Sequence, residues 1–147
     1  MHGAAPEQML DFWVEKLHQH GYRVTTPRRL VMEIIAASPA ALSPKEIYER
    51  TLEEEQEVGI ASVYRTVEML EELDLVQQVH QPDGCHGVWP VYKGHNHYLI
   101  CQECGRMEVI PGDEDIESYI HKVEAQTGYR IEEHWLQFFG LCSQCAH

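Results

Sequence analysis

Two Cys-x-x-Cys motifs near the end of the chain constrain its fold more than any other feature. Cys101 and Cys104 form the first motif, Cys142 and Cys145 form the second, and 37 residues separate them. In a reducing compartment, this arrangement is typical of one tetrathiolate zinc site. Four sulfur ligands complete a tetrahedron without water, so such a zinc stabilises a fold and does not catalyse. The alternative is a pair of redox-active dithiols.

The chain contains no segment that resembles a signal peptide or a membrane span. Its first twenty residues lack an apolar run behind a basic start, and no stretch approaches the eighteen or more apolar residues of a membrane helix. We therefore expect a cytoplasmic protein with reduced thiols and no membrane partner.

The charge of the chain argues against nonspecific binding to nucleic acid. The formal net charge is −13, divided as −7 over residues 1–80 and −6 over residues 81–147. Contact with phosphates requires a local cationic surface. Any DNA-binding function must therefore depend on where the few arginines lie.

The first half of the chain is punctuated like a series of short helices. In the first segment, which ends at Gly21, residues at near-helical spacing are Met9, Phe12, Trp13, Leu17 and His20. In the second segment, Thr26 is the expected N-cap and Pro27 the first helical residue. Leu30, Ile34 and Ala37 are expected to face inward.

Two further helices and a hairpin complete this half. Ser43 can cap the third helix, with Pro44 at its first position and Glu46 closing a capping box. The fourth spans about 59–76, where an apolar stripe of Ile60, Val63, Val67 and Leu70 leaves Ser62, Arg65 and Thr66 outside it and Tyr64 on its flank. LVQQVH and CHGVWPVY flank a PDG turn signal. The pattern predicts a helix-turn-helix with a two-stranded wing.

The character of the sequence changes after Tyr92. Strands are expected over HNHYLIC, RMEVI and YRIEEHWLQFFG, with a helix over about 113–127 that Gly128 closes. His95 and His97 would share one face of the first strand and could reach one metal together. The alternative is two solvent-exposed histidines on an edge strand.

Other donors could complete a metal site around His95 and His97. His134 is a candidate third ligand, although a lone histidine among apolar residues is usually part of a core. Glu117, or else Glu114, could be the fourth ligand. This ligand type suits zinc, iron(II) and manganese(II).

A further cluster lies around the PDG turn. The hairpin would bring His80 back toward Cys85 or His86, and a thiolate ligand favours zinc over manganese. The alternative is that Cys85 is a small buried apolar residue.

Four stretches taken together resemble the ferric-uptake-regulator (Fur) superfamily of metal-responsive repressors. They are GYRVTTPRRLVMEII, GIASVYRTVEMLEELDLV, HNHYLICQECG and HWLQFFGLCSQC, and the resemblance runs from Gly21 to Cys145. It implies an α+β chain with a winged-helix DNA-binding domain over residues 1–84 and a small α/β dimerisation domain over 85–147. It also implies a homodimer that binds a palindromic double-stranded DNA operator when loaded with metal.

The resemblance assigns roles to particular residues. Tyr64 and Arg65, with Ser62 beside them, match the recognition helix, and Arg23 matches a basic position that reaches the minor groove. The four cysteines match a structural zinc site. The site within the dimerisation domain matches His95, His97, Glu117 and His134.

The chain also departs from the family pattern. It has no histidine in PAALSP, before Ser43, where iron and peroxide sensors usually carry one. Asn96 and Tyr98 stand where many members have ligand histidines. We therefore expect an interdomain sensing site built from His80, Cys85 and His86, with zinc as the regulatory metal and a zinc-uptake-regulator-like function. Iron(II) or manganese(II) sensing, and peroxide sensing, are the alternatives.

Two other classes of function deserve comparison. A zinc enzyme would need an open coordination position and a general base, but the chain lacks HExxH and any HxE preceding PCxxC. A zinc-stabilised protein-interaction module would suit the acidic surface and would not depend on Tyr64 or Arg65. We expect a regulator and not an enzyme.

Overall fold

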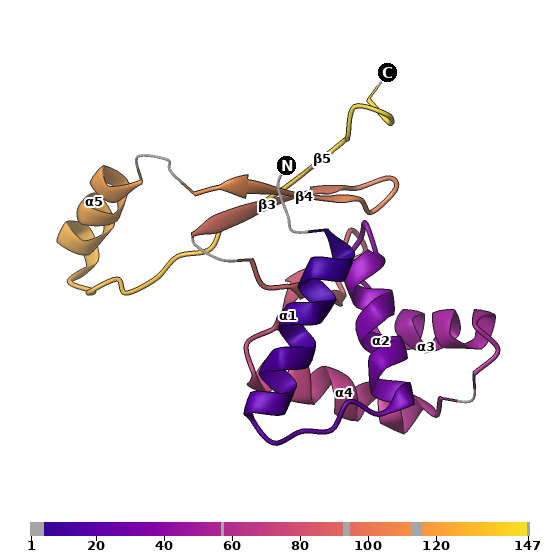
Figure 1. Cartoon of the computed structure of the whole chain (residues 1–147). Coiled ribbons are helices and arrows are strands. Elements are labelled where there is room, and N and C mark those ends of the chain that lie inside the picture. The colour runs from indigo at the N-terminus through magenta and orange to yellow at the C-terminus, as the bar shows by residue number, and fades with distance from the viewer. Residues whose placement is uncertain (1–4, 57, 93–94, 113–115, 147) are drawn as a thin grey trace.

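The computed structural model describes residues 5–56, 58–92, 95–112 and 116–146. Figure 1 shows a helical part and a second part built on a small sheet with one helix beside it. The elements in chain order are α1 (Pro6–Gln19), α2 (Thr26–Ala37), α3 (Pro44–Glu53), α4 (Ile60–Glu72), β1 (Val76–His80), β2 (His86–Pro90), β3 (Asn96–Cys101), β4 (Met107–Pro111), α5 (Glu117–Thr127) and β5 (Gln137–Gly140).

The first four helices share one apolar core. Each of them supplies side chains that are almost completely buried, among them Trp13, Val31, Ile47, Val63 and Leu70. Helices α3 and α4 form the helix-turn-helix, and β1 and β2 form the wing. The expected winged-helix architecture is therefore confirmed, and the chain is of the α+β class.

Local capping explains where these helices begin. Ser43 and Glu46 form the expected capping box: the Glu46 backbone N–H donates to Ser43 Oγ at 3.1 Å, and the Ser43 N–H donates to Glu46 Oε1 at 3.0 Å. The expected cap of α2 was wrong by one residue. Thr25, not Thr26, accepts a hydrogen bond from the Arg28 N–H.

Several expected core positions were also wrong. Ala37 is exposed, Ile34 is half-buried, and Phe12 and Ile60 are 45% and 41% exposed. Leu10, Val31, Met32 and Ile35 are buried instead. Thr66 was placed outside the apolar stripe but is buried, because its hydroxyl donates to the Ser62 carbonyl oxygen at 2.8 Å and so needs no water.

The wing is an antiparallel pair in which Val76 lies opposite Pro90 and His80 opposite His86. Leu42 forms a bridge to Val88 on the other side of β2, so β1 is the outer strand. The expected domain boundary between residues 84 and 85 falls in the turn of this hairpin. A division that keeps the hairpin whole would lie after Pro90.

The second sheet has the strand order β4-β3-β5, with β3 antiparallel to β4 and parallel to β5. Helix α5 begins at Glu117, whereas residues 113–115 of the expected helix lie outside the described residues. The expected strand from Tyr129 was largely wrong. Only residues 137–140 pair with β3, opposite residues 98–101, and the preceding segment is irregular.

The two parts of the chain are in direct contact. Val79 and Trp89 of the wing pack with Ile100 and Met107 of the second sheet, together with Ala41. The Met107 N–H donates to the Pro39 carbonyl oxygen at 2.8 Å. Among the described helices, none is long and apolar enough to cross a membrane.

Candidate metal centres and nucleic-acid interface

The parallel pairing of β3 and β5 brings the two Cys-x-x-Cys motifs together. Cys101 ends β3 and lies opposite Gly140, which ends β5 just before Cys142. The sulfur atoms of Cys101, Cys104, Cys142 and Cys145 all lie within 4.8 Å of one another. Cys104 Sγ and Cys142 Sγ are 3.8 Å apart. Because a zinc tetrahedron with Zn–S bonds of about 2.3 Å has edges of about 3.8 Å, the four free thiols fit zinc.

Backbone N–H groups stabilise the thiolate form of Cys101, which is the form that binds a metal. The N–H groups of Cys104 and Cys142 point at Cys101 Sγ, at 3.5 and 3.4 Å, and lower the pKa of the Cys101 thiol to about 6. Contact with Cys142 and burial raise the pKa of Cys145. For Cys104, the Arg106 backbone lowers the pKa, but Cys101, burial and Cys142 together raise it. Because the raised pKa values favour protonated Cys104 and Cys145, a metal cation that binds the four sulfurs would displace their protons.

Three imidazoles form a second cluster at the other end of β3. The ligand atoms of His95, His97 and His134 also lie within 4.8 Å of one another. His95 Nε2 and His134 Nε2 are 3.0 Å apart, close to the edge of about 3.3 Å expected around a tetrahedral zinc with Zn–N bonds of about 2.0 Å. His97 is buried, although it carries a polar ring. The donor set therefore fits a metal with a preference for nitrogen ligands.

His95 is exposed and directly precedes β3, whereas His97 is buried within it. β3 is the central strand of its sheet, so His97 is not an exposed residue on an edge strand. His134 comes from the irregular segment before β5 and not from a strand. Glu117 does not join the three imidazoles in a group of close ligand atoms among the described residues, and Glu114 lies outside them.

Gly112, which directly follows β4, contacts His95. Its N–H donates to the His95 carbonyl oxygen at 2.7 Å. A Cβ atom at this position would overlap the His95 imidazole ring. Sequence reasoning missed this residue, because its role depends on a contact between neighbouring strands.

The third expected cluster is only partly assembled. The rings of His80 and His86 lie across the wing with their centroids 4.8 Å apart. Cys85 is exposed in the turn, and its N–H donates to Asp83 Oδ1. The three side chains do not form a close ligand group among the described residues. Their role in sensing stays a prediction.

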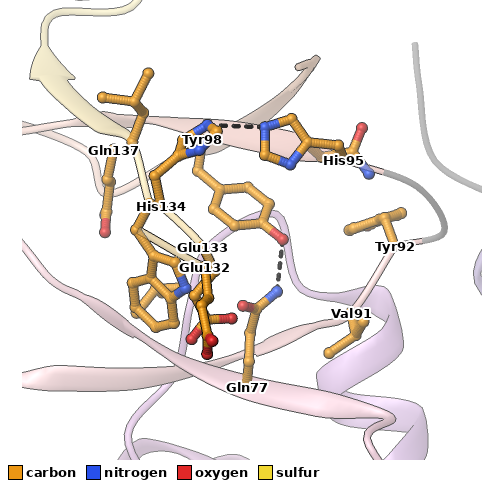
Figure 2. A pocket seen from close by; sticks show the side chains of 13 residues that line it. Gln77, Val91, Tyr92, His95, Tyr98, Glu132, Glu133, His134 and Gln137 are labelled. Atoms are coloured by element: carbon orange, nitrogen blue, oxygen red, sulfur yellow. Dashed lines mark hydrogen bonds between the residues drawn. The ribbon is translucent and has the colours of Figure 1, made fainter. Parts of the chain in front are cut away.

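A pocket of about 600 Å³ lies between the wing and the second sheet. Figure 2 shows His95 and His134 at one end of it, with Gln77 and Tyr98 hydrogen-bonded across the space between the two parts of the chain. Glu132 and Glu133 also line this pocket. The three-histidine cluster thus lies beside the contact between the domains.

A cationic groove lies on the helical domain. Its cavity of about 470 Å³ is lined by the start of α2 and by α4: Gly21, Tyr22, Arg23, Thr25, Pro27, Arg28, Ser62, Arg65 and Thr66. No acidic residue is among these described lining residues. Arg65 Nη2 donates to Ser62 Oγ at 3.2 Å, and Tyr64 beside them is 49% exposed. The groove collects three of the four predicted DNA-binding residues on one face.

Arg28 is an additional cation in this groove. Its guanidinium donates to the Arg23 carbonyl oxygen at 2.7 Å and lies over the Tyr22 ring, 5.8 Å from the centroid. These contacts fix the loop that carries Arg23. The Pro-Arg-Arg run at the start of a helix was the only sequence signal for Arg28. The contact of Arg28 with the preceding loop could not be predicted from residue spacing.

Many apolar and aromatic side chains of the second domain are exposed. None of the described residues of α5 is buried, and β5 is an outer strand. Exposed apolar and aromatic side chains gather on these elements and nearby: Leu99, Tyr119, Tyr129, Trp135, Phe138, Phe139 and Leu141. A surface of this kind usually contacts a partner.

A winged helix joined to a small sheet that holds two metal-ligand clusters defines a metal-responsive DNA-binding regulator. The profile of the Ferric uptake regulator family matches residues 19–139. The chain belongs to this family. It is accordingly a transcriptional regulator and not an enzyme, and it binds operator DNA as a homodimer.

Individual proteins support the same assignment. The Ferric uptake regulation protein of Bacillus subtilis is 32% identical over 145 residues, with 95% of each chain covered. The solved structure of the Helicobacter pylori ferric uptake regulator, described as revealing three functional metal-binding sites, has a TM-score of 0.69 at 23% identity, covering 99% of this chain and 97% of that one. A zinc uptake regulator complexed with zinc and DNA has a TM-score of 0.70 at 19% identity, covering 96% and 95%. The last two likenesses concern the fold alone.

Proposed function

We propose that this protein is a cytoplasmic, zinc-responsive repressor that binds a palindromic operator and controls genes of metal homeostasis. The observation that carries the proposal is the position of the three-histidine cluster, beside the contact between the DNA-binding domain and the second domain. A metal held there can favour one arrangement of the two domains over others. The four-cysteine zinc would maintain the second domain in either arrangement.

The donor set favours zinc over manganese. His95, His97 and His134 offer three imidazole nitrogens within 4.8 Å of one another, whereas manganese(II) prefers oxygen ligands. Iron(II) also accepts imidazole, so iron sensing is the second candidate. The absence of a histidine in PAALSP argues against it.

The wing cluster would add a zinc-selective ligand. His80 and His86 are already adjacent, and the exposed Cys85 directly precedes His86 in the turn. If this trio senses zinc, Cys85→Ala should weaken zinc-dependent operator binding. Unchanged zinc dependence in that variant would remove the trio from the proposal.

DNA recognition would follow from the cationic groove. We assign a minor-groove contact to Arg23, phosphate contacts to Arg28, and base contacts in the major groove to Tyr64 and Arg65, with Ser62 positioning the Arg65 guanidinium. A local cluster of this kind can bind DNA although the chain has a net charge of −13.

The exposed apolar surface of α5 and β5 would be the homodimer interface, because a second copy can bury it. Phe139→Asp should then shift the protein toward monomer in sedimentation velocity. A variant that remains fully dimeric would place the interface elsewhere.

The DNA-binding assignment can be tested with a duplex selected from a random library by the zinc-loaded protein. Arg65→Ala should weaken binding to that duplex by at least about tenfold and relax its base preference. Arg130→Ala is the matched control, since Arg130 lies in the second domain and is paired with Glu132. Equal affinities for Arg65→Ala and wild type would refute the assignment.

A further inference from the structure

Two residues that lie opposite each other in the second sheet, here called a rung, each form hydrogen bonds to β1 of the wing. Tyr98 of β3 and Gln137 of β5 are paired in register. Gln77 Nε2 of β1 donates to the Tyr98 hydroxyl at 2.5 Å. Gln137 Nε2 donates to the His80 carbonyl oxygen at 2.9 Å, and the His80 N–H donates to Gln137 Oε1 at 3.3 Å.

The Gln137 side chain bonds the backbone N–H and carbonyl of His80, the groups that a further strand next to β1 would otherwise bond. β1 is the outer strand of the wing, and the bond from the Gln81 N–H to the Cys85 carbonyl oxygen means that the backbone groups of His80 point away from β2. The side-chain amide of Gln137 offers one donor and one acceptor to this single residue. Glutamine and asparagine alone carry both groups on a side-chain amide.

The same rung adjoins two imidazoles of the three-histidine cluster. His97 directly precedes Tyr98, and His134 lies three residues before Gln137 on the same segment. Tyr98, Gln137 and His134 also line the pocket between the domains (Figure 2). A shift of these imidazoles as they close on a metal would therefore move the rung that holds β1.

The domains are also joined by the Met107–Pro39 backbone hydrogen bond, by a bridge between Ala40 and Arg106, and by an apolar cluster. The cluster of Val79, Trp89, Ile100 and Met107 is apolar, and apolar packing is not directional. Trp89 Nε1 is buried there and has no hydrogen-bond partner among the described residues. The hydrogen bonds of Gln77 and Gln137 are the contacts that link the outer strand of the wing, β1, directly to β3 and β5 beside the three-histidine cluster.

We propose that Gln137 is a positioning residue that couples metal binding at His95, His97 and His134 to the orientation of the wing. The proposal rests on the metal-dependent DNA binding proposed above and adds the residue that transmits it. Metal and DNA affinities are then linked through Gln137, so its loss lowers the effect of each ligand on the other by the same factor.

The test uses the full-length dimer with zinc in its four-cysteine site. Gln137→Met keeps the length of the side chain and removes both hydrogen bonds. Gln78→Met is the matched control, because Gln78 lies on β1, the strand that Gln137 contacts, but bonds Glu71 within the first domain, at 3.2 Å. Zinc affinity of the free protein is measured by chelator competition, and affinity for the selected duplex by anisotropy with and without additional zinc.

For Gln137→Met, the zinc affinity of the free protein should stay within about threefold of wild type, while the zinc-induced gain in DNA affinity should fall by roughly five- to thirtyfold. Gln78→Met should keep the full gain. A full gain in Gln137→Met would overturn the inference. If wild type itself shows no gain with zinc, the proposed function fails and the inference with it.

Tyr98→Phe provides a second measurement if Gln137→Met does not fold. It removes only the hydroxyl that accepts from Gln77 and should reduce the gain by up to about fivefold. An unchanged gain in that variant, measured in a folded dimer, would contradict a role for this rung.

Discussion

The imidazoles of His95 and His134 meet edge to face, with their Nε2 atoms 3.0 Å apart, although 38 residues lie between them in the chain. Without a metal, one ring nitrogen must donate to the other. With a metal, both nitrogens become ligands and no proton lies between them. The arrangement is therefore prepared for an ion that accepts nitrogen donors.

Removal of one imidazole should abolish tight binding at this cluster. For His134→Ala, we expect the affinity for zinc beyond the equivalent held by the cysteines to fall by at least about 100-fold. His121→Ala is the matched control, since His121 is exposed on α5 and outside the close group. Chelator competition measures both. Equal affinities would show that the cluster is not a metal site.

Gly112→Ala should act on the same cluster without removing a ligand. The added Cβ would overlap the His95 ring, so His95 must rotate away from His97 and His134. We expect zinc affinity at the cluster to fall by about tenfold or more, with the four-cysteine site unchanged. Gly140→Ala has open space around the added atom and should bind zinc like wild type. Full affinity in Gly112→Ala would contradict the observed contact.

Zinc binding by the four cysteines should strengthen as pH rises through neutrality. The pKa of Cys101 is lowered to about 6, but those of Cys104 and Cys145 are raised, so zinc must displace protons from these thiols. Raising the pH removes that competition. Competition with a chelator from about pH 6.5 to about pH 8.5 measures the slope. An affinity independent of pH would be inconsistent with protonated thiols in the metal-free cluster.

Acid should weaken the junction between α3 and the wing. Burial opposes ionisation of Glu46, but hydrogen bonds from Gln81 and Ser43 outweigh it and hold the pKa of Glu46 below 4.5. The ionised form therefore stabilises the fold above this value, and the contribution is lost as pH falls through the lowered pKa.

Urea unfolding of Glu46→Gln tests this effect. At neutral pH the variant should be less stable by no more than about 1 kcal/mol, because the carboxylate is exposed and screened. The difference from wild type should shrink as the pH falls through the lowered pKa of Glu46 and vanish below it. Glu49→Gln, on the exposed face of the same helix, is the control. A difference that persists in acid would mean that ionisation of Glu46 is not its cause.

The helical domain could be predicted from sequence because its signals are local. Pro44 and the Ser43–Glu46 capping box mark a helix start within four residues, and the buried stripe of Val63, Val67 and Leu70 follows helical spacing. The exception is Thr66, whose hydroxyl bonds within its own helix and can be buried.

The metal centres could be predicted in part. The spacing of the cysteines indicated the four-sulfur cluster. The spacing of His95 and His97, two residues apart and so on one face of a strand, indicated the second cluster. The irregular conformation around His134 could not be predicted from its apolar neighbours. It depends on the pairing of β3 with β5, in which residues 98–101 lie opposite residues 137–140 and the segment before Gln137 has no partner strand in the described sheet. The contributions of Gly112 and Gln137 depend on neighbours distant in sequence.

The central claim is that zinc controls DNA binding, and one titration tests it most directly. Buffered zinc, iron(II) and manganese(II) are titrated separately into the protein with the selected fluorescent duplex, and anisotropy is followed. We expect tight binding with zinc at free concentrations at least about tenfold below those needed for the other two metals. Binding that is independent of metal, or that iron(II) or manganese(II) induces equally well, would contradict the account.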